Sequence, residues 1–570
     1  MASIARKDLT KEKFDAIVIG TGISGGWAAK ELCENGLKTL VLDRGRLVEH
    51  IKDYPTMNMD PWDFEHRGRA TRKDVERQEK QSRTGYTTGE ASKHWFVDDI
   101  DHPYSETERF DWMRGYHVGG RSIMWGRQVY RLSDIDFTAN LKDGHGVDWP
   151  IRYKDLESWY DKVEEFIGVS GENLGLKQLP DGKFGPAMEL NCVEEDFKEK
   201  INSSFDDRVI TPGRVAHKTG NAVHEGRSNC QYRNRCIRGC PFGGYFSSNS
   251  STLPAAERTG NMTLRPNSIA YEIVYDDELK KATGVRVIDT ISKEIMFFKA
   301  EIIFCCASAL ASASILMQSK SDRFPNGLGN DSGELGHNIM DHHFKVGAVA
   351  FTDKFEDKYY KGRKPNGFYI PRFRNLDSKT KQEEYIRGFG YQGGAQRENW
   401  QRSVGEMSYG KELKEDLTKP GMWQIGMTAF GECLPYHDNK MTLNYDTLDQ
   451  WGLPTIDFDV KFRENEKRMR VDMKQSALDM LRAAGFENAF PYEEESYPGN
   501  GIHEMGSARM GRDPKTSVLN SNNQIHACQN VYVTDGACMT SAGCQNPSLT
   551  YMALTARAAN HAAKLLKANS

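Results

Sequence analysis

The chain has 570 residues, more than a single hydrophobic core usually holds, so we expect two domains. Hydrophobic residues make up 38% of the sequence and charged residues 27%, a balance typical of a folded globular protein that argues against extensive disorder. The 76 basic and 80 acidic residues leave a net charge of −4, which gives no reason to expect a nucleic-acid partner.

Neither the start of the chain nor its longest apolar stretch predicts a membrane protein. Residues 1–14 are polar and mixed in charge, without the apolar region of a secretory signal peptide. Residues 302–317 contain several serines and fall short of the ~20 apolar residues that a membrane helix needs. We therefore predict a protein that does not span a membrane.

The first fifty residues predict a strand, a helix and a second strand. Residues 14–19 form a short apolar run typical of a strand, and residues 23–33 are typical of a helix that ends at Gly36. Residues 38–42 are apolar again and predict the second strand. The first strand therefore leads directly into a turn and the start of the helix.

Gly20, Gly22 and Gly25 place the pattern G-x-G-x-x-G in that turn. The first glycine makes the tight turn, the second lets backbone approach a pyrophosphate, and the third lets helix and strand pack closely. The helix N-terminus adds free N–H groups and the positive end of its dipole. Asp43 ends the second strand, 23 residues after Gly20, where an acid hydrogen-bonds ribose hydroxyls. These residues predict a dinucleotide site but do not separate FAD from NAD.

The nucleotide-binding pattern returns late in the chain. A strand followed by a helix is predicted over residues 301–318, a strand over 531–534, and a terminal helix from about 547 to 566. The stretch between about 341 and 499 differs, because aromatic and polar residues alternate there, as in an antiparallel sheet with one solvated face; the clearest segments are 367–371, 388–393 and 422–430.

The predicted fold is therefore α/β plus α+β. A Rossmann-type dinucleotide-binding domain is built from discontinuous segments, residues 1–340 and 500–570. A substrate-binding domain based on an antiparallel sheet, residues 341–499, interrupts it.

Several motifs follow one another in a recognisable order: residues 114–126 (RGYHVGGRSIMWG), 148–151 (DWPI) with 156–160, 503–511 (HEMGSARMG), 534–536 (TDG) and 546–550 (NPSLT). Together they resemble the flavin loop, the segment after it, the catalytic-histidine motif and the C-terminal flavin-binding strand and helix start of the glucose–methanol–choline (GMC) oxidoreductases. The resemblance runs from residue 14 to about 565, so it covers nearly the whole chain.

The resemblance implies FAD as the cofactor. Its expected contacts are Gly20, Gly22, Gly25, Asp43, Arg44, Gly119, Gly120, Ser122, Trp125, Asp535, Gly536, Pro547 and Ser548. Met124 and Trp125 stand where some sugar-oxidising relatives carry a histidine bonded covalently to the flavin, so we expect FAD to be bound non-covalently.

The resemblance also assigns the catalytic pair. It implies that His503 is the base for the hydroxyl proton and that Asn546 hydrogen-bonds the same hydroxyl. A histidine, with an unperturbed pKa of about 6.5, suits that role near neutral pH, and the flavin, through N5, is the hydride acceptor. Asn546 is histidine in another branch of the family. Ser308 stands where relatives more often have glycine, a departure from the family's turn.

Cys230, Cys236 and Cys240 follow the spacing C-x5-C-x3-C, with Pro241 after the last cysteine. Cysteine thiolates are the usual ligands of iron–sulfur clusters, and a proline after the last ligand recurs in them. This insert, about residues 225–245, resembles the cluster-binding segment of flavin-dependent glucose, gluconate and glucoside 3-dehydrogenases and predicts a [3Fe-4S] cluster. A loop with free thiols or one disulfide, or a zinc site with His224, are the alternatives.

The sequence is thus identified as an FAD-dependent oxidoreductase acting on CH–OH groups, most similar to glucoside 3-dehydrogenases. Such an enzyme oxidises a ring hydroxyl of a sugar or glycoside to a ketone and passes electrons through the cluster to a cytochrome or quinone. Expected partners are a small subunit and a cytochrome c. Export with that subunit would place the chain in the periplasm, and the cytoplasm is the alternative. The rivals are a pyranose-oxidase-like enzyme that uses oxygen and a non-redox lyase of the same family.

Overall fold

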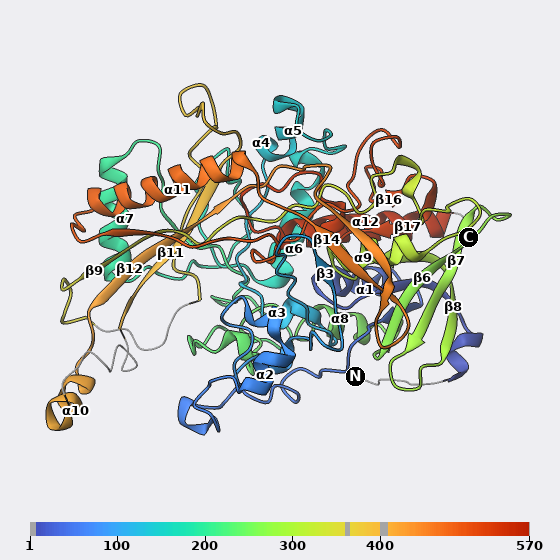
Figure 1. The fold of residues 1–570 in the computed structure, drawn as a ribbon, viewed down its shortest axis with the longest axis horizontal. Coiled ribbons are helices and arrows are strands. Elements are labelled where there is room, and N and C mark those ends of the chain that lie inside the picture. Colours follow the sequence, from blue (N-terminus) through green and yellow to red (C-terminus); the bar gives the residue numbers. More distant parts are fainter. Residues whose placement is uncertain (1–6, 359–364, 399–408, 569–570) are drawn as a thin grey trace.

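The computed structural model describes residues 7–358, 365–398 and 409–568. Two large sheets lie at opposite ends of the long axis of the molecule, with most of the helices around and between them (Figure 1). The sheet at the right of Figure 1 carries the nucleotide-binding motif, and the sheet at the left carries the alternating aromatic segments.

The first sheet has a parallel centre. Its strands lie in the order β16 (Gln524–Ile525), β17 (Cys528–Val533), β8 (Ile295–Cys305), β1 (Lys13–Ile19), β2 (Thr39–Leu42) and β5 (Met262–Arg265). Every neighbouring pair from β17 to β5 is parallel, whereas β16 pairs with β17 antiparallel. Two further antiparallel strands, β7 (Lys281–Asp289) and β6 (Ser268–Asp276), extend from β8. The predicted Rossmann-type sheet is confirmed.

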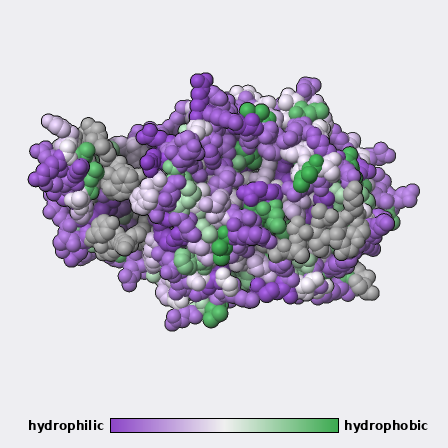
Figure 2. Space-filling view, turned by 90° about the horizontal axis from the view of Figure 1, so that it is seen from below, coloured by the Kyte–Doolittle hydropathy of each residue, from purple (hydrophilic) through white to green (hydrophobic). Residues whose placement is uncertain are grey.

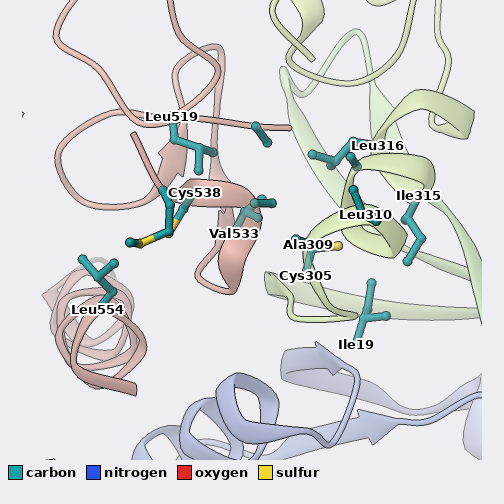
Figure 3. Close-up of a cluster of buried hydrophobic side chains, with 14 of the residues drawn as sticks. Ile19, Cys305, Ala309, Leu310, Ile315, Leu316, Leu519, Val533, Cys538 and Leu554 are labelled. Atoms are coloured by element: carbon teal, nitrogen blue, oxygen red, sulfur yellow. The ribbon is translucent and has the colours of Figure 1, made fainter. Parts of the chain in front are cut away.

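Side chains of β1 alternate between two cores, because successive residues of a strand point to opposite faces. Ala16 and Val18 pack with helices α1 (Ile23–Glu34), α8 (Thr252–Arg258) and α12 (Ser548–Ala568). Ile17 and Ile19 pack on the other face with α9 (Ala309–Gln318). Figure 3 shows part of this second core, in which Ile19, Cys305 and Leu310 belong to one cluster with Val533 and Leu519 from the C-terminal part of the chain.

The second sheet is antiparallel, as the alternating aromatic segments predict. Its strands lie in the order β15 (Phe490–Glu493), β9 (Val346–Thr352), β12 (Trp423–Gly431), β11 (Phe389–Arg397), β10 (Phe368–Ile370) and β4 (Thr211–Pro212). Helix α11 (Glu464–Ala483) packs on it, and α7 (Cys192–Ser204) contacts α11, β11 and β12.

Burial alternates strictly along β12, so one face of this sheet packs against the helices and the other stays half-exposed. Aromatic residues of the alternating segments are buried: Phe368, Tyr391 and Trp423 lie in the layer between the sheet and the helices, Tyr369 packs in a separate cluster with Tyr130, and all four are at most 2% exposed. A sugar cannot stack on them without displacing the core. They are core residues, and the half-exposed face of β12 carries Gln424, Thr428 and Phe430.

The sheets are assembled across the sequence. β17 pairs with β8 although five strands of the second sheet, β9, β10, β11, β12 and β15, lie between them in the chain. β4 and α7, in turn, join the second sheet from a segment before residue 340. The domain limits at 340 and 499 stay a prediction, whereas the discontinuous construction of the parallel sheet is directly visible.

The remaining α-helices are short, and three further strands form a small third sheet. The helices are α2 (Arg72–Arg77), α3 (Glu79–Ser82), α4 (Asp134–Phe137), α5 (Ala139–Asp143), α6 (Glu157–Ile167) and α10 (Gly410–Thr418), and the strands are β3 (Ser105–Glu106), β13 (Lys440–Leu448) and β14 (Pro454–Asp459). Within the described ranges no helix has the length and apolar character to cross a membrane. The face in Figure 2 is mostly hydrophilic, with scattered hydrophobic side chains.

Candidate active site

The glycine turn lies between the end of β1 and the start of α1, as predicted. Gly20 has φ +97°, and a Cβ there would lie 2.4 Å from the Cys306 carbonyl oxygen at the end of β8. A Cβ on Gly25 would lie 2.0 Å from the Gly20 carbonyl oxygen, so Gly25 lets α1 pack on the turn. Nothing lies within 4 Å of a Cβ placed on Gly22, which faces open space. The turn therefore leaves room beside Gly22 for a ligand.

Asp43 closes the turn from the end of β2. Its carboxylate accepts hydrogen bonds from the Thr21 amide at 3.2 Å, from the Thr21 hydroxyl, and from the Gly45 amide at 2.8 Å. Burial raises the pKa of Asp43 to about 6. The carboxylate lies on the wall of the same open space, where it can accept further hydrogen bonds from ribose hydroxyls.

The predicted flavin loop folds against this turn. The Gly119 amide donates to the Thr21 hydroxyl at 2.8 Å, and Gly120 begins the short helix η4 (Gly120–Ile123). The Ser122 hydroxyl donates to the Gly119 carbonyl at 2.6 Å, and the Trp125 indole N–H donates to the Phe246 carbonyl at 3.0 Å. The Gly119–Thr21 hydrogen bond joins two segments that lie 98 residues apart in the sequence, and the other two contacts hold the loop itself in place.

Both segments line a cavity of about 500 Å³. Of the predicted site residues, it is lined by Gly20, Gly22, Asp43, Arg44, Gly120, Ser122, Trp125, His503, Asp535, Gly536, Asn546 and Ser548. Three predicted contacts do not line the cavity: Gly25, Gly119 and Pro547. Each is the chain neighbour of a residue that does. One cavity thus gathers residues from the start, the middle and the end of the chain.

The cavity wall suits a polar, anionic dinucleotide such as FAD. Buried polar atoms without a hydrogen-bond partner in the described chain include Nε and Nη2 of Arg127 and Nε2 of His117, both cavity-lining residues. Buried polar groups require partners, which a bound cofactor would supply. Helix α1 begins at Gly22 without a side-chain cap, so its first N–H groups are available for a phosphate.

Arg44 and Asp535 lie at two places on this wall. The Arg44 guanidinium lies 4.0 Å from the Tyr116 ring centre and 5.7 Å from that of Trp451. Asp535 accepts hydrogen bonds from the Ser312 hydroxyl at 2.6 Å and from the Ala537 amide at 3.0 Å, and burial raises the pKa of Asp535 to about 6. Arg44 therefore packs in an aromatic cluster, and Asp535, which follows β17, is held by a hydrogen bond from Ser312 of α9.

The backbone conformation at Ser308 explains why relatives more often have glycine at this position. Its φ of +84° with ψ of 150° lies in a region that is accessible almost only to glycine. Ser308 is the N-cap residue of α9, where its side chain makes no capping hydrogen bond, and it lines the cavity. The turn is thus present, and the departure in sequence is accommodated as backbone strain.

The predicted catalytic pair is assembled on the cavity wall. The Asn546 side-chain nitrogen lies 3.2 Å from His503 Nε2, and both residues line the cavity. Burial, followed by the nearby His342 and Arg121, holds the pKa of His503 well below its usual value of 6.5. His503 is therefore neutral and able to accept a proton at neutral pH.

Two residues that were not predicted from the sequence, His342 and Asp341, contact His503. His342 Nδ1 lies 2.8 Å from His503 Nδ1, and His342 Nε2 lies 2.7 Å from the Gly543 carbonyl oxygen. The Asp341 carboxylate accepts from the His503 amide at 3.0 Å, the His342 amide at 2.8 Å and the Gly501 amide at 2.9 Å. Burial and the nearby Glu504 raise the pKa of Asp341 to about 7.

Arg121 and Glu504 tie the flavin loop to the histidine segment. The guanidinium donates two hydrogen bonds to the carboxylate, at 2.8 and 3.1 Å, and Glu504 is nearly fully buried. Two parallel charge-assisted hydrogen bonds fix geometry as well as charge. Since Glu504 follows His503 directly, this pair holds the catalytic segment against η4.

Gln392 of β11 connects the catalytic pair to the second sheet. Its side-chain nitrogen donates to the Asn546 side-chain oxygen at 2.6 Å. Gln392 and Gln128 also line a second, larger cavity of about 1650 Å³, which borders the half-exposed face of β11 and β12. Amide side chains are frequent on its wall: Gln128, Asn191, Asn234, Asn366, Gln392, Gln396 and Gln424.

The signal for the missed residues was present in the sequence. Asp341, His342 and His343 are three consecutive titratable residues, directly at the predicted domain limit. Gln392 lies in one of the segments that predicted the second sheet. No spacing rule, however, links either segment to His503.

The cysteine segment packs against the flavin loop. The Tyr245 hydroxyl lies within hydrogen-bond reach of the carbonyl of Ile123 in η4 and, at 3.1 Å, of the carbonyl of Cys236. Cys236 Sγ lies 3.8 Å from His217 Nε2, and His224 Nδ1 lies 3.2 Å from the Phe166 carbonyl oxygen. No group of three or more His, Cys, Asp or Glu side chains in residues 7–358, 365–398 and 409–568 could hold a metal ion.

Cys230, Cys236 and Cys240 are therefore free thiols, and the described residues offer no ligand group for the iron–sulfur cluster or for the zinc alternative. The predicted cluster gains no support from the structure. What the structure does establish is that this segment contacts the loop that lines the cofactor cavity.

The fold and the cavity together define an FAD-dependent oxidoreductase acting on CH–OH groups. The GMC oxidoreductase N- and C-terminal family models match residues 14–344 and 435–555, and the chain belongs to the GMC oxidoreductase family.

Similar proteins extend over nearly the whole chain. The chain is 25% identical to the fructose dehydrogenase large subunit of Gluconobacter japonicus, over 96% of this chain and 97% of that protein. It is 26% identical to the 2-methyl-1,2-propanediol dehydrogenase of Mycolicibacterium austroafricanum, over 96% and 95%. A formate oxidase variant from Aspergillus oryzae has the same fold, with a TM-score of 0.59 at 14% identity, over 98% and 99% of the two chains.

Proposed function

We propose that the protein oxidises a ring hydroxyl of a sugar or glycoside to a ketone, in the manner of a glucoside 3-dehydrogenase. The observation that carries this proposal is the pair formed by His503 Nε2 and the Asn546 side-chain nitrogen, 3.2 Å apart on the wall of the cofactor cavity. A base and a hydrogen-bond donor at that spacing can both contact the oxygen of one hydroxyl group.

The residues of the site divide the chemistry as follows. Because Gln392 donates to the Asn546 oxygen, the Asn546 nitrogen faces His503 and donates to Nε2. His503 Nε2 therefore carries no proton and can accept the substrate's hydroxyl proton, while Asn546 donates to the developing alkoxide oxygen. FAD, when bound, would accept at its N5 atom the hydride from the carbon that carries this oxygen.

A sugar is favoured as substrate by the second cavity. Amide side chains both donate and accept hydrogen bonds, as sugar hydroxyls do, and seven of them line this cavity. Gln392 and Gln128 belong to both cavities, so a substrate held at Asn546 can extend from one into the other. The fructose dehydrogenase relative is named for a sugar substrate, which supports the same class.

The route of electrons beyond the flavin is proposed only in outline. The fructose dehydrogenase relative is named a large subunit, which supports a partner subunit for this chain as well. We propose a small subunit and a cytochrome c as partners, in the periplasm through export with the subunit or else in the cytoplasm. The [3Fe-4S] cluster at Cys230, Cys236 and Cys240 is proposed from spacing alone, and no step above depends on it. About three irons per FAD in anaerobically purified protein would support the cluster, and iron-free protein would remove it.

An anaerobic screen of sugars, glycosides and simple alcohols tests the reaction. A sugar or glycoside should bleach the flavin absorbance, and NMR of the product should show a ring ketone. Bleaching by simple alcohols alone would overturn the choice of sugar, and an unchanged flavin during product formation would favour the lyase reading. In air, stoichiometric hydrogen peroxide would favour the pyranose-oxidase-like alternative over the dehydrogenase.

A further inference from the structure

We infer that His342 is a positioning residue that fixes the tautomer of the catalytic base, through a one-way chain of hydrogen bonds that ends at the Gly543 carbonyl. The inference deepens the proposed function, since it rests on His503 acting as the base. His342 does not line the cofactor cavity, so it acts through His503 and not on the substrate.

The direction of the chain follows from its fixed end. The Gly543 carbonyl oxygen can only accept, so His342 must donate to it from Nε2 at 2.7 Å. A neutral imidazole carries one N–H, which leaves His342 Nδ1 as an acceptor. His503 Nδ1, 2.8 Å away, must then be the donor, so the proton of neutral His503 lies on Nδ1.

The opposite end of the chain gives the same answer independently. Gln392 donates to the Asn546 oxygen at 2.6 Å, which turns the Asn546 nitrogen toward His503 Nε2 at 3.2 Å. That nitrogen can only donate, so His503 Nε2 must be unprotonated. Both ends thus place the free lone pair of His503 on the cavity side, where a substrate hydroxyl would bind.

The histidine end of the chain is held in place because His342 is buried and the backbone of both histidines is anchored. His342 is fully buried, and burial holds its pKa below the usual 6.5, which keeps it neutral. The Asp341 carboxylate accepts from the amides of both His342 and His503, so the two rings are held in one frame. After His503 takes a proton, His342 Nδ1 still accepts from the same N–H. The third member of a catalytic triad acts on its histidine in the same way.

Two matched pairs of variants separate this role from packing. His342→Gln keeps a donor and an acceptor at a spacing close to that of the ring nitrogens, whereas His342→Phe keeps the ring and loses both. His342→Asn keeps an acceptor near the position of Nδ1, whereas His342→Leu, of similar size, keeps none. His343→Leu is the control, since His343 is equally buried and its ring nitrogens contact no hydrogen-bond partner in the described chain.

Each variant is purified with FAD, and its kcat and KM are measured with the substrate found in the screen. His342→Phe and His342→Leu should lose about 10–10²-fold in kcat with little change in KM, as is typical when the orienting partner of a functional imidazole is removed. His342→Gln and His342→Asn should each recover most of that loss relative to its partner, and His343→Leu should match wild type.

Several results would overturn the inference. Wild-type kcat in His342→Phe would do so, and so would equal losses in the polar and apolar member of each pair, which would indicate packing alone. If one apolar variant loses FAD, the other pair still gives the comparison. His503→Ala distinguishes the role of the base from the role of His342. If His503→Ala remains active, the proposed base is wrong. If His503→Ala is inactive and His342→Phe is active, only the role of His342 is refuted.

Discussion

The Gln392 side-chain nitrogen donates a 2.6 Å hydrogen bond to the Asn546 side-chain oxygen, and this contact joins β11 of the antiparallel sheet to the residue that precedes Pro547 and α12. It orients the Asn546 amide, because an amide oxygen that accepts from Gln392 leaves the nitrogen for His503. The antiparallel sheet therefore contributes directly to the geometry of the catalytic pair.

His503→Ala should retain FAD and lose activity. The substitution removes the proton acceptor but leaves the glycine turn and the Arg121–Glu504 pair in place. We expect kcat to fall about 10²–10⁴-fold, the usual contribution of a positioned general base. Steady-state rates are compared at equal FAD content. A rate within about threefold of wild type would remove His503 from this role.

The pH dependence of kcat/KM should reflect the lowered pKa of His503. The base acts in its neutral form, and burial, His342 and Arg121 all lower its pKa below 6.5. Activity should therefore stay constant as the pH falls to 6.5 and decline only below that value, since protonation then removes the acceptor. A profile measured with saturating electron acceptor checks this. An acidic limb centred above 6.5 would contradict it.

The sequence predicted the parts of the site that obey local rules. The glycine turn, Asp43 and the catalytic motif depend on spacing within one segment, and the structure gathers Gly22, Asp43, His503 and Asn546 around one cavity. His342 escaped prediction because its contact with His503 spans 161 residues and arises only when the two segments pack. The pairing of β17 with β8 could not be predicted for the same reason, since the two strands are far apart in the sequence and meet only in the folded chain.

Denaturation should release the flavin. Residues 119–126 contain no histidine, cysteine or tyrosine that could bond the flavin. Met124 and Trp125, which stand where some relatives carry the linked histidine, line the cavity. Acid precipitation should leave the yellow colour in the supernatant, with FAD identified by mass. Colour that stays in the pellet would contradict non-covalent binding, and peptide mapping would then locate the linked residue.

Ser308→Gly should stabilise the protein. Ser308 holds φ +84° and ψ 150°, a conformation that costs a residue with a side chain about 1–3 kcal/mol. Glycine relieves this strain but loses more chain entropy on folding, so we expect a net gain of about 1 kcal/mol. Thermal unfolding of the FAD-bound enzyme measures it. Ser308→Ala is the control: it removes the same hydroxyl but keeps the strain, so its Tm should not rise.

The glycine turn offers a last test, because Gly22 and Gly25 should fail in different ways. A Cβ on Gly22 meets nothing within 4 Å and faces the cavity, so Gly22→Val should fold and yet block the space that we assign to the pyrophosphate. A Cβ on Gly25 would lie 2.0 Å from the Gly20 carbonyl oxygen, so Gly25→Ala must displace α1 from the turn itself.

The measurements are FAD content, from the ratio of flavin to protein absorbance, and the Tm of the cofactor-free proteins. Gly22→Val should be purified without FAD, with an apoprotein Tm equal to that of wild-type apoprotein, because the clash exists only with the ligand. Gly25→Ala should lower the apoprotein Tm before any cofactor is added. Full FAD occupancy in Gly22→Val would show that the dinucleotide does not approach the turn at Gly22, and a lowered apoprotein Tm in that variant would show that the space beside Gly22 serves the fold.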